Sequence, residues 1–214
     1  MTSFSRSRAG FLQSPLTKSL DFSNSSQFQL IGTLKEHNGC VNRICWSDDG
    51  AFLASASDDL QVCLWELEAG RLKTSFSTTH TNSISGIRLL PNCNYRSTVT
   101  GAIDSVVEHH TLFEDLSALH STVQLFCHRS RVKYIEIEAD NPNLFFSAAE
   151  DGCVRQYDVR LPGFGCGHHS GADFNSIGSQ YDSPNCLLVS PPNTKLFSMR
   201  ICPTDVNLFV VASR

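Results

Sequence analysis

Short runs of alternating apolar and polar residues, separated by tight-turn sequences, dominate the chain from residue 40 onward. The first four runs span residues 40–46, 51–57, 61–67 and 71–76. Runs of this length that are rich in apolar, β-branched and aromatic residues and are bounded by Asp-Gly turns predict antiparallel β-meanders. No window shows the sustained i, i+3, i+4, i+7 apolar spacing of a helix. The pattern therefore predicts an all-β protein.

Three segments align without a gap around an aspartate, at residues 55–66, 100–111 and 147–158. In each segment a hydroxyl lies four residues before the Asp, a ring lies six residues after it, and a histidine lies upstream. The recurring residues are His37, Ser55, Asp59 and Trp65; His80, Thr100, Asp104 and His110; and His128, Ser147, Asp151 and Tyr157. The aspartates are 45 and 47 residues apart. Four short strands in about 40–45 residues predict a propeller blade rather than a helical repeat.

The recurring side chains predict one buried polar network in each blade. The Asp can accept a hydrogen bond from the His, the imidazole can reach the hydroxyl, and the hydroxyl can meet the ring on the third strand. A buried network of this kind is tolerated only when every member is bonded, and each bond contributes about 1 kcal/mol. We therefore expect these histidines and aspartates to have structural rather than catalytic roles.

The repeat also predicts the organisation of the chain. We expect a flexible Ser-rich leader, three blades, a Gly-, Ser- and His-rich loop and an incomplete fourth blade, at residues 1–30, 31–76, 77–117, 118–160, 161–194 and 195–214. Propellers close with about 4–8 blades. A chain of about three and a half blades is expected to form a partial, unclosed propeller with bare sheet faces. This predicts a fragment, a truncated isoform or an incomplete gene product, which would aggregate or need a partner.

Composition narrows the class of protein. The chain has 214 residues, 41% of them hydrophobic, and a formal net charge of −4, so it lacks the basic surplus of a nucleic-acid-binding protein. It has no apolar stretch of about 18 residues and no secretory signal, which predicts no membrane association. Its nine cysteines are odd in number and irregularly spaced. We expect them to be reduced thiols that serve as small core hydrophobes in an intracellular protein of the nucleus or cytoplasm.

Catalytic and metal-binding patterns are weak. The adjacent residues His109 and His110 would point to opposite faces of a strand, so they are not expected to bind one metal ion. Cys166, His168 and His169 could bind zinc, but no second pair of ligands follows at a zinc-site spacing. No phosphate-binding glycine loop, nucleophile elbow or HExxH motif occurs. We expect neither a cofactor nor enzymatic activity.

These repeats resemble the WD-repeat family. Residues 36–37 and 65–66 are Glu-His and Trp-Glu where the family has Gly-His and Trp-Asp. Residues 157–158 are the variant Tyr-Asp, whereas residues 110–111 depart from the pattern with His-Thr. The resemblance implies a propeller that acts as a platform for protein partners, since fold alone does not define the partner.

A second resemblance involves residues 145–160, which match the pattern called the DWD box and end in Tyr157, Asp158 and Arg160. This box resembles that of WD-repeat proteins that dock onto the DNA-damage-binding adaptor of cullin-4 RING ubiquitin ligases. The resemblance implies that Arg160 offers its guanidinium to acidic or carbonyl groups of the adaptor, while Asp151 and Asp158 hold the turn. Arginine suits such an interface because its five donors form a rigid fork.

Longer segments resemble the cullin-4-associated factors, in particular the group in which tetratricopeptide repeats follow the WD repeats. The segments are residues 37–59, 89–92 and 141–160, and the resemblance covers about residues 30–213. It implies a substrate-receptor subunit of a cullin-4 ligase. The alternatives are a generic WD-repeat scaffold for another complex and a non-functional truncated fragment.

Overall fold

The computed structural model describes residues 30, 32–139, 141–161, 164, 187–189, 193–202 and 205–214. The chain divides into two compact units, Met1–Thr33 and Leu34–Arg214, and every strand belongs to the second. The leader expected at residues 1–30 lies outside the described residues except for Leu30, which is exposed. Within the described ranges no helix is long and apolar enough to cross a membrane.

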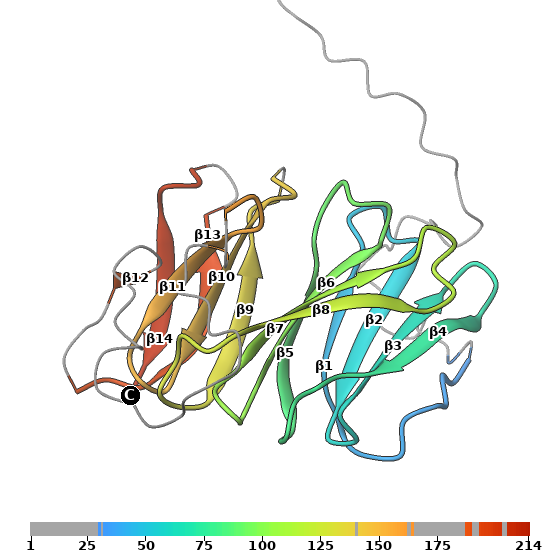
Figure 1. Cartoon of the computed structure of the whole chain (residues 1–214), viewed down its shortest axis with the longest axis horizontal. Helices are drawn as coiled ribbons and strands as arrows, with labels where there is room; N and C mark the ends of the chain where they lie inside the picture. The colour runs from blue at the N-terminus through green and yellow to red at the C-terminus, as the bar shows by residue number, and fades with distance from the viewer. Residues whose placement is uncertain are drawn as a thin grey trace, which may run out of the picture. The chain divides into compact units, whose positions relative to one another are not determined.

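The first sheet contains β1 (Val41–Trp46), β2 (Phe52–Ser57), β3 (Gln61–Glu66) and β4 (Arg71–Ser77) in sequential antiparallel order (Figure 1). These strands lie where the apolar runs predict them. The turn between β1 and β2 ends at Gly50, whose φ of 74° favours glycine because it has no Cβ atom. Each residue of β2 after its first is buried, since this strand lies inside the sheet.

The second sheet contains β5 (Ile84–Leu89), β6 (Ser97–Ala102), β7 (Val107–Leu112) and β8 (Leu119–Leu125). The predicted boundary between residues 117 and 118 is wrong, because β8 pairs with β7 and completes the second blade rather than opening the third. This outermost strand is only partly buried and carries the polar run His-Ser-Thr, so it gives little apolar signal in the sequence.

The third sheet contains β9 (Val132–Ile137), β10 (Leu144–Ala149), β11 (Val154–Asp158) and β12 (Leu187–Val189). The prediction of a loop at residues 161–194 is corrected at β12, which pairs with β11 as the fourth strand of this blade. This strand has three residues and is largely exposed. Because it pairs with a strand about 30 residues earlier in the chain, no turn sequence next to it indicates a hairpin.

The fourth sheet pairs β13 (Leu196–Ile201) with β14 (Phe209–Ser213). Together the described strands form four antiparallel sheets of four, four, four and two strands that do not close into a ring, which confirms the expected all-β partial propeller. Exposed apolar residues lie on the first and last of these sheets, among them Ile44, Trp46 and Val210.

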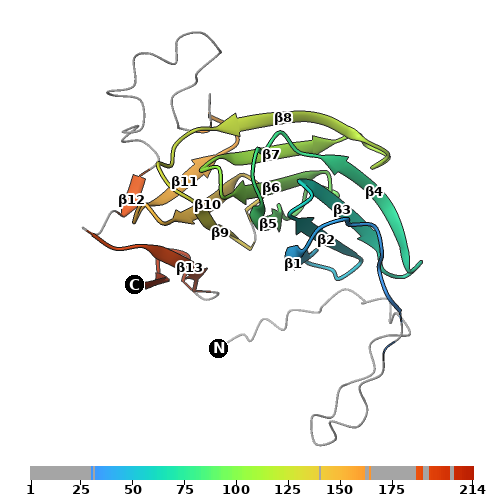
Figure 2. The ribbon, with the colours of Figure 1, turned by 90° about the horizontal axis from the view of Figure 1, so that it is seen from below.

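The sheets lie side by side through their first strands, with β1 next to β5, β5 next to β9 and β9 next to β13 (Figure 2). The amide of Asn42 on β1 donates to the carbonyl of Ile84 on β5 at 3.0 Å, and Ser85 Oγ on β5 donates to the carbonyl of Val132 on β9. Apolar clusters fill the space between successive sheets. Burial between sheets therefore stabilises each blade through its neighbours.

Two glycines allow the second and third sheets to approach closely. A Cβ atom on Gly101 would lie 2.6 Å from Val132 Cγ1, and one on Gly86 would lie 3.0 Å from Ile135 Cγ1. Both distances are shorter than ordinary van der Waals contact, so the backbones could not pack at this separation with a larger residue.

Cysteine burial follows the expectation only in part. Cys45 and Cys63 are buried, and burial raises the pKa of these thiols to about 11 and about 12. Cys40 is exposed, and Cys153 is half-buried. Cys127 is disulfide-bonded, so the expectation that all cysteines are reduced thiols is wrong for this residue. Irregular spacing in the sequence does not show which cysteines the fold brings together.

We predict that Gly101→Ala lowers the free energy of unfolding of the chain by about 1–3 kcal/mol, because the added methyl group overpacks the contact between the second and third sheets. Urea denaturation of the whole chain measures this change. Gly32→Ala is the matched control, since its Cβ would meet nothing within 4 Å. Equal losses for the two variants would contradict the close-packing role of Gly101.

Candidate functional site

The first blade contains the polar network that its sequence predicts. His37 Nδ1 lies 3.0 Å from an oxygen of Asp59, and His37 Nε2 lies 2.8 Å from Ser55 Oγ. Trp65 Nε1 donates to the same hydroxyl oxygen at 2.9 Å. The structure thus brings the four residues into one connected chain between the turn before β3 and the interior of the sheet.

The third blade repeats this arrangement with a phenol as the ring. His128 Nδ1 lies 2.9 Å from Asp151, and His128 Nε2 lies 2.6 Å from Ser147 Oγ. The hydroxyl groups of Ser147 and Tyr157 are 3.0 Å apart. The Tyr157 ring also stacks on Phe145 at a centroid distance of 4.7 Å, so the polar chain ends in an apolar core.

The second blade also forms a complete network, although its ring is an imidazole. His80 Nδ1 lies 3.1 Å from Asp104, and His80 Nε2 lies 2.9 Å from Thr100 Oγ1. His110 Nε2 lies 2.8 Å from the same hydroxyl. His110 therefore occupies the place that Trp65 and Tyr157 have in the other blades.

The donors and acceptors of these side chains allow the hydrogen bonds of each network to run in only one direction. A carboxylate only accepts, so Nδ1 of the first histidine must donate to the Asp, which leaves Nε2 as an acceptor. The hydroxyl then donates to Nε2 and accepts from the ring. Every ring must accordingly be a donor, as an indole N–H and a phenol O–H both are. The networks run from ring to hydroxyl to histidine to aspartate.

His110 meets this requirement as a neutral ring that carries its proton on Nε2. Its Nδ1 then accepts from Thr122 Oγ1 on β8, at 3.0 Å. Burial, together with the nearby rings of His80 and His109, lowers the pKa of His110 to about 3. The neutral tautomer is thus the stable form near neutral pH, and it replaces the indole N–H of the common repeat.

The aspartates at the end of each network also hold the turn before the third strand. Asp151 accepts from the backbone amides of Arg129 and Cys153, both at 2.9 Å, besides His128. Burial of this carboxyl group raises its pKa, but the hydrogen bonds from His128 and the two amides outweigh burial and lower the pKa to about 2. Asp151 is therefore charged at neutral pH and joins three segments of the blade.

Sequence reasoning missed Glu108, a buried carboxylate on β7. It accepts from the backbone amide of Thr79 at 3.2 Å, from the Thr79 hydroxyl and from Gln124 Nε2 at 3.1 Å. Its Oε2 lies 3.6 Å from His110 Nε2. Glu108 is four residues after Asp104, and the same offset gives Cys63 and Arg155 in the other blades, so the repeat has no shared chemistry there that could have signalled it.

A second candidate site lies at the opposite end of the sheets, where β3, β7 and β11 end; we call this end the Arg160 rim. Arg160 Nε and Nη2 donate to the two carboxylate oxygens of Asp158 at 2.9 and 2.6 Å, and the Arg160 backbone amide donates to the same carboxylate. This pairing lowers the pKa of Asp158. The Arg160 side chain is 63% exposed, so the fork is oriented but accessible.

The four residues that the DWD resemblance groups together do not form one surface. Tyr157 is fully buried in the third network. Asp151 precedes β11 and Arg160 follows it, so the two residues lie at opposite ends of this strand. Of the four residues, Arg160 and Asp158 contact each other on the rim, and the other two support the blade from inside.

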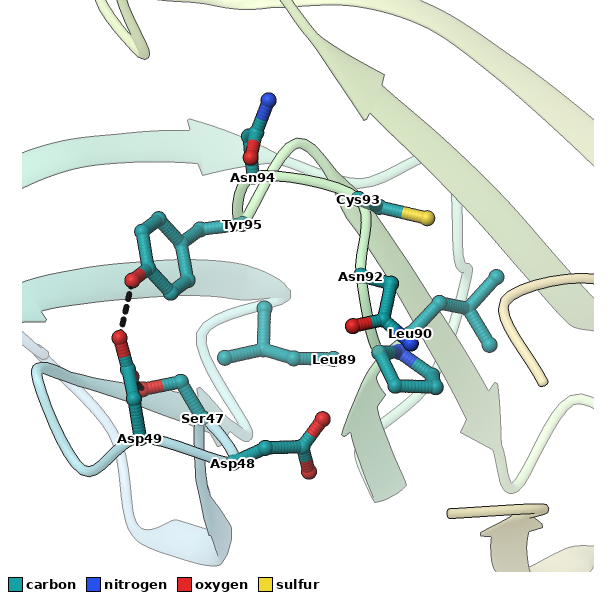
Figure 3. Close-up of a pocket in the computed structure, with 10 residues that line it drawn as sticks. Ser47, Asp48, Asp49, Leu89, Leu90, Asn92, Cys93, Asn94 and Tyr95 are labelled. Carbon is teal, nitrogen blue, oxygen red and sulfur yellow. Dashed lines mark hydrogen bonds between the residues drawn. The ribbon is translucent and has the colours of Figure 1, made fainter. Parts of the chain in front are cut away.

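A small hollow of about 200 Å³ lies on the same rim, between the turn after β1 and the segment after β5 (Figure 3). Tyr95 donates its hydroxyl hydrogen to Asp49 across the hollow, and this bond raises the pKa of Tyr95 to about 12. Leu89 and Leu90 line the inner part. The hollow is smaller than typical small-molecule sites of about 300–1,000 Å³, so it has the size of a single side chain.

The segment that lines this hollow connects three blades. Tyr95 packs on Phe52 of the first blade with ring centroids 4.4 Å apart. Leu90 and Cys93 join the apolar cluster that contains Phe145 and Val159 of the third blade. The turn that carries Arg160 follows Val159 directly, so this segment supports the Arg160 rim.

The histidine and cysteine candidates form no metal site in the part of the chain that the structure describes. There, no group of three or more His, Cys, Asp and Glu side chains could hold a metal ion. His109 bonds Ser97 Oγ at 2.6 Å and stacks on Phe145, whereas His110 contacts Phe76, so the two rings lie on opposite faces of the sheet. Cys166, His168 and His169 lie outside the described residues.

Comparison with known proteins agrees with this geometry. The family model described as "WD domain, G-beta repeat" matches residues 28–66, which contain the first network. The chain carries WD repeats. The second and third networks place a histidine, a hydroxyl, an aspartate and a ring in the same roles beyond the matched segment, which extends the assignment through the third sheet.

Several curated proteins are similar to this chain. "WD and tetratricopeptide repeats protein 1" of Homo sapiens is 35% identical over 179 residues, which cover 82% of this chain and 25% of the relative. "Protein ALTERED SEED GERMINATION 2" of Arabidopsis thaliana is 36% identical over 133 residues, or 59% of this chain and 18% of the relative. "DDB1- and CUL4-associated factor 6" of Homo sapiens is 30% identical over 135 residues, or 63% and 16%. The chain spans a quarter or less of these relatives.

We predict that His110 makes the stability of this WD-repeat chain sensitive to acid. As the pH falls below 6.5, the unfolded chain binds a proton at His110, whereas the folded chain stays neutral down to about pH 3. The free energy of unfolding should therefore fall by about 1.4 kcal/mol per pH unit from this group within that window, and the contribution is fully present above it.

The test compares the wild type with His110→Gln by urea denaturation from about pH 7 to about pH 4. The Gln amide can donate to Thr100 and accept from Thr122, but it does not titrate. We expect the pH dependence of the variant to be weaker by about one proton. Parallel pH profiles for the two proteins would show that His110 is not the responsible group.

Proposed function

We propose that this chain is the WD-repeat module of a substrate receptor for a cullin-4 RING ubiquitin ligase, and that Arg160 makes the contact with the ligase adaptor. The observation that carries the proposal is the exposed Arg160 guanidinium, which Asp158 orients at the end of β11. The name of one relative, "DDB1- and CUL4-associated factor 6", supports DDB1 as the adaptor and CUL4 as the cullin.

The geometry of the turn suits a docking contact. Asp158 accepts from Arg160 Nε and Nη2, so the remaining donors of the fork are available at the surface. Holding the side chain in one orientation lowers the entropy lost on binding. Exposed apolar side chains lie at the same end of the sheets, namely Leu161 on the same turn and Phe113 after β7. Arginine and large apolar side chains are among the residue types enriched in protein interfaces, so this combination suits a docking surface.

The neighbouring blade ends differ from the Arg160 turn. At the corresponding turn of the first blade, Arg71 at the start of β4 pairs across the turn with Glu66 at the end of β3. Arg160 lies two residues after Asp158, and the equivalent positions are Glu68 in the first blade and Phe113 in the second. We infer that the third blade alone among these three provides the adaptor contact, and that its buried network through Tyr157 fixes the end of β11.

We predict that Arg160→Ala lowers the recovery of DDB1 and CUL4 with the tagged chain by at least about tenfold, because truncation removes a central interface arginine. Quantitative co-purification from cells measures the recovery. Arg71→Ala is the matched control, since Arg71 is also exposed and paired with a carboxylate on the same rim. The thermal unfolding midpoint of both variants should equal that of the wild type, because exposed ion pairs contribute little to stability.

Two outcomes would contradict the proposal. Equal recovery of the adaptor with Arg160→Ala and with the wild type would show that Arg160 is not the contact. If the wild type recovers neither protein but co-purifies with another complex, the chain acts as a WD-repeat scaffold outside the ligase.

A further inference from the structure

Three arginines from three different sheets converge on one tyrosine ring. The guanidinium carbons of Arg43 on β1, Arg88 on β5 and Arg200 on β13 lie 5.0, 5.2 and 5.5 Å from the centroid of the Tyr134 ring on β9. Each distance is within the range of a cation–π contact. These four residues, with Glu136, are called the arginine cluster, and they lie on the first strands, away from Arg160.

The arginines also bridge neighbouring sheets by hydrogen bonds. Arg43 Nε donates to the carbonyl of Ser85 at 3.2 Å, and Arg88 Nη2 donates to Tyr134 Oη at 2.8 Å. Arg200 Nη1 donates to Glu136 Oε2 at 3.2 Å, and Arg88 Nη2 lies 3.5 Å from the same oxygen. One role of the cluster is therefore to tie the sheets together.

Positive charge in the cluster exceeds what this role requires. Of the three guanidinium groups around the Tyr134 ring, those of Arg88 and Arg200 contact the carboxylate of Glu136, so the cluster carries an excess of two positive charges. Like charges at such distances repel one another, and a bound anion removes this repulsion. Within the described residues, the terminal nitrogens of Arg43 donate to no protein acceptor, and Arg200 uses Nη1 alone.

The cluster is open to a ligand on one side. The Arg200 side chain is 64% exposed, whereas Arg88 and Glu136 are 12% and 10% exposed and form the base of the site. Tyr134 is buried and packs against Leu196 and Met199, so the ring that holds the guanidinium groups is itself fixed. The free donors thus belong to Arg43 and Arg200, whose guanidinium groups are each held by the Tyr134 ring and by one hydrogen bond.

We propose that the arginine cluster binds a carboxylate side chain of an acidic polypeptide segment. Glu136 shows how a carboxylate is held here, because two arginines from different sheets approach one of its oxygens. Arg43 and Arg200 supply the remaining donors for a second carboxylate, because the planar guanidinium group presents its donors in the geometry that pairs with carboxylates. The ligand is an acidic segment of a protein partner, and the site is independent of the Arg160 rim.

The test measures binding of a fluorescein-labelled polyglutamate peptide to the whole chain by fluorescence anisotropy, with a polyglutamine peptide as the probe control. We expect the polyglutamate peptide alone to bind, with an affinity that falls as salt increases. Arg43→Gln and Arg200→Gln should each weaken binding by about tenfold, the loss expected for one charge-assisted contact. Arg200 is exposed, so its replacement leaves the fold intact and keeps the test valid if Arg43→Gln unfolds.

Matched controls separate the cluster from general electrostatic attraction. Arg71→Gln removes one exposed positive charge outside the cluster and should leave peptide affinity unchanged. An equal loss in Arg71→Gln and Arg200→Gln, or no polyglutamate binding by the wild type, overturns the proposal. Competition by inorganic phosphate more strongly than by acetate also overturns it, because the ligand group is then a phosphate. Arg160→Ala should bind the peptide normally, so failure here is distinguishable from failure of adaptor docking.

Discussion

The directed hydrogen-bond chain from ring to hydroxyl to histidine to aspartate is the constraint on which the blades of this chain depend. It connects the third strand, the second strand, the segment before the first strand and the turn before the third strand. Because its members are buried, leaving any one unpaired would cost more than the bond itself contributes. Each blade therefore retains one register, and the rim at the other end of the strands is fixed with it.

The second blade shows that the network requires a particular hydrogen-bonding capacity and not a particular residue. A ring that donates one hydrogen bond is required, and the neutral His110 supplies it through Nε2 while Thr122 satisfies its other nitrogen. Because the protonated form of the buried His110 is unfavourable in the folded chain, the stability of the fold depends on pH. Glu108 lies beside the same network and is satisfied by Thr79 and Gln124, so the second blade carries the most polar interior of the three.

Internal hydrogen bonding and exposed side chains are found at opposite ends of the strands of this propeller. The end that carries the aspartate turns is filled by internal hydrogen bonds, whereas the end that carries Arg160 presents exposed side chains held by short local contacts. The segment after β5 links the first blade to the third beneath that rim. On the inner strands, arginines both join the sheets and leave donors unused, so the same residues serve packing and the proposed binding of an acidic segment.

The sequence by itself determined the strands of the first blade, the repeat spacing and the members of all three networks, because each depends on local alternation or on fixed offsets within one blade. It did not determine the fourth strands, of which β8 is largely polar and β12 has three residues, nor the disulfide at Cys127. The sequence pattern grouped Tyr157 and Asp151 with Arg160. In the structure Tyr157 is buried inside the sheet, and Asp151 lies at the other end of β11 from Arg160. Only the tertiary structure brought Arg43, Arg88 and Arg200 to one ring, since residues on separate sheets meet through packing that leaves no periodic signal in the chain.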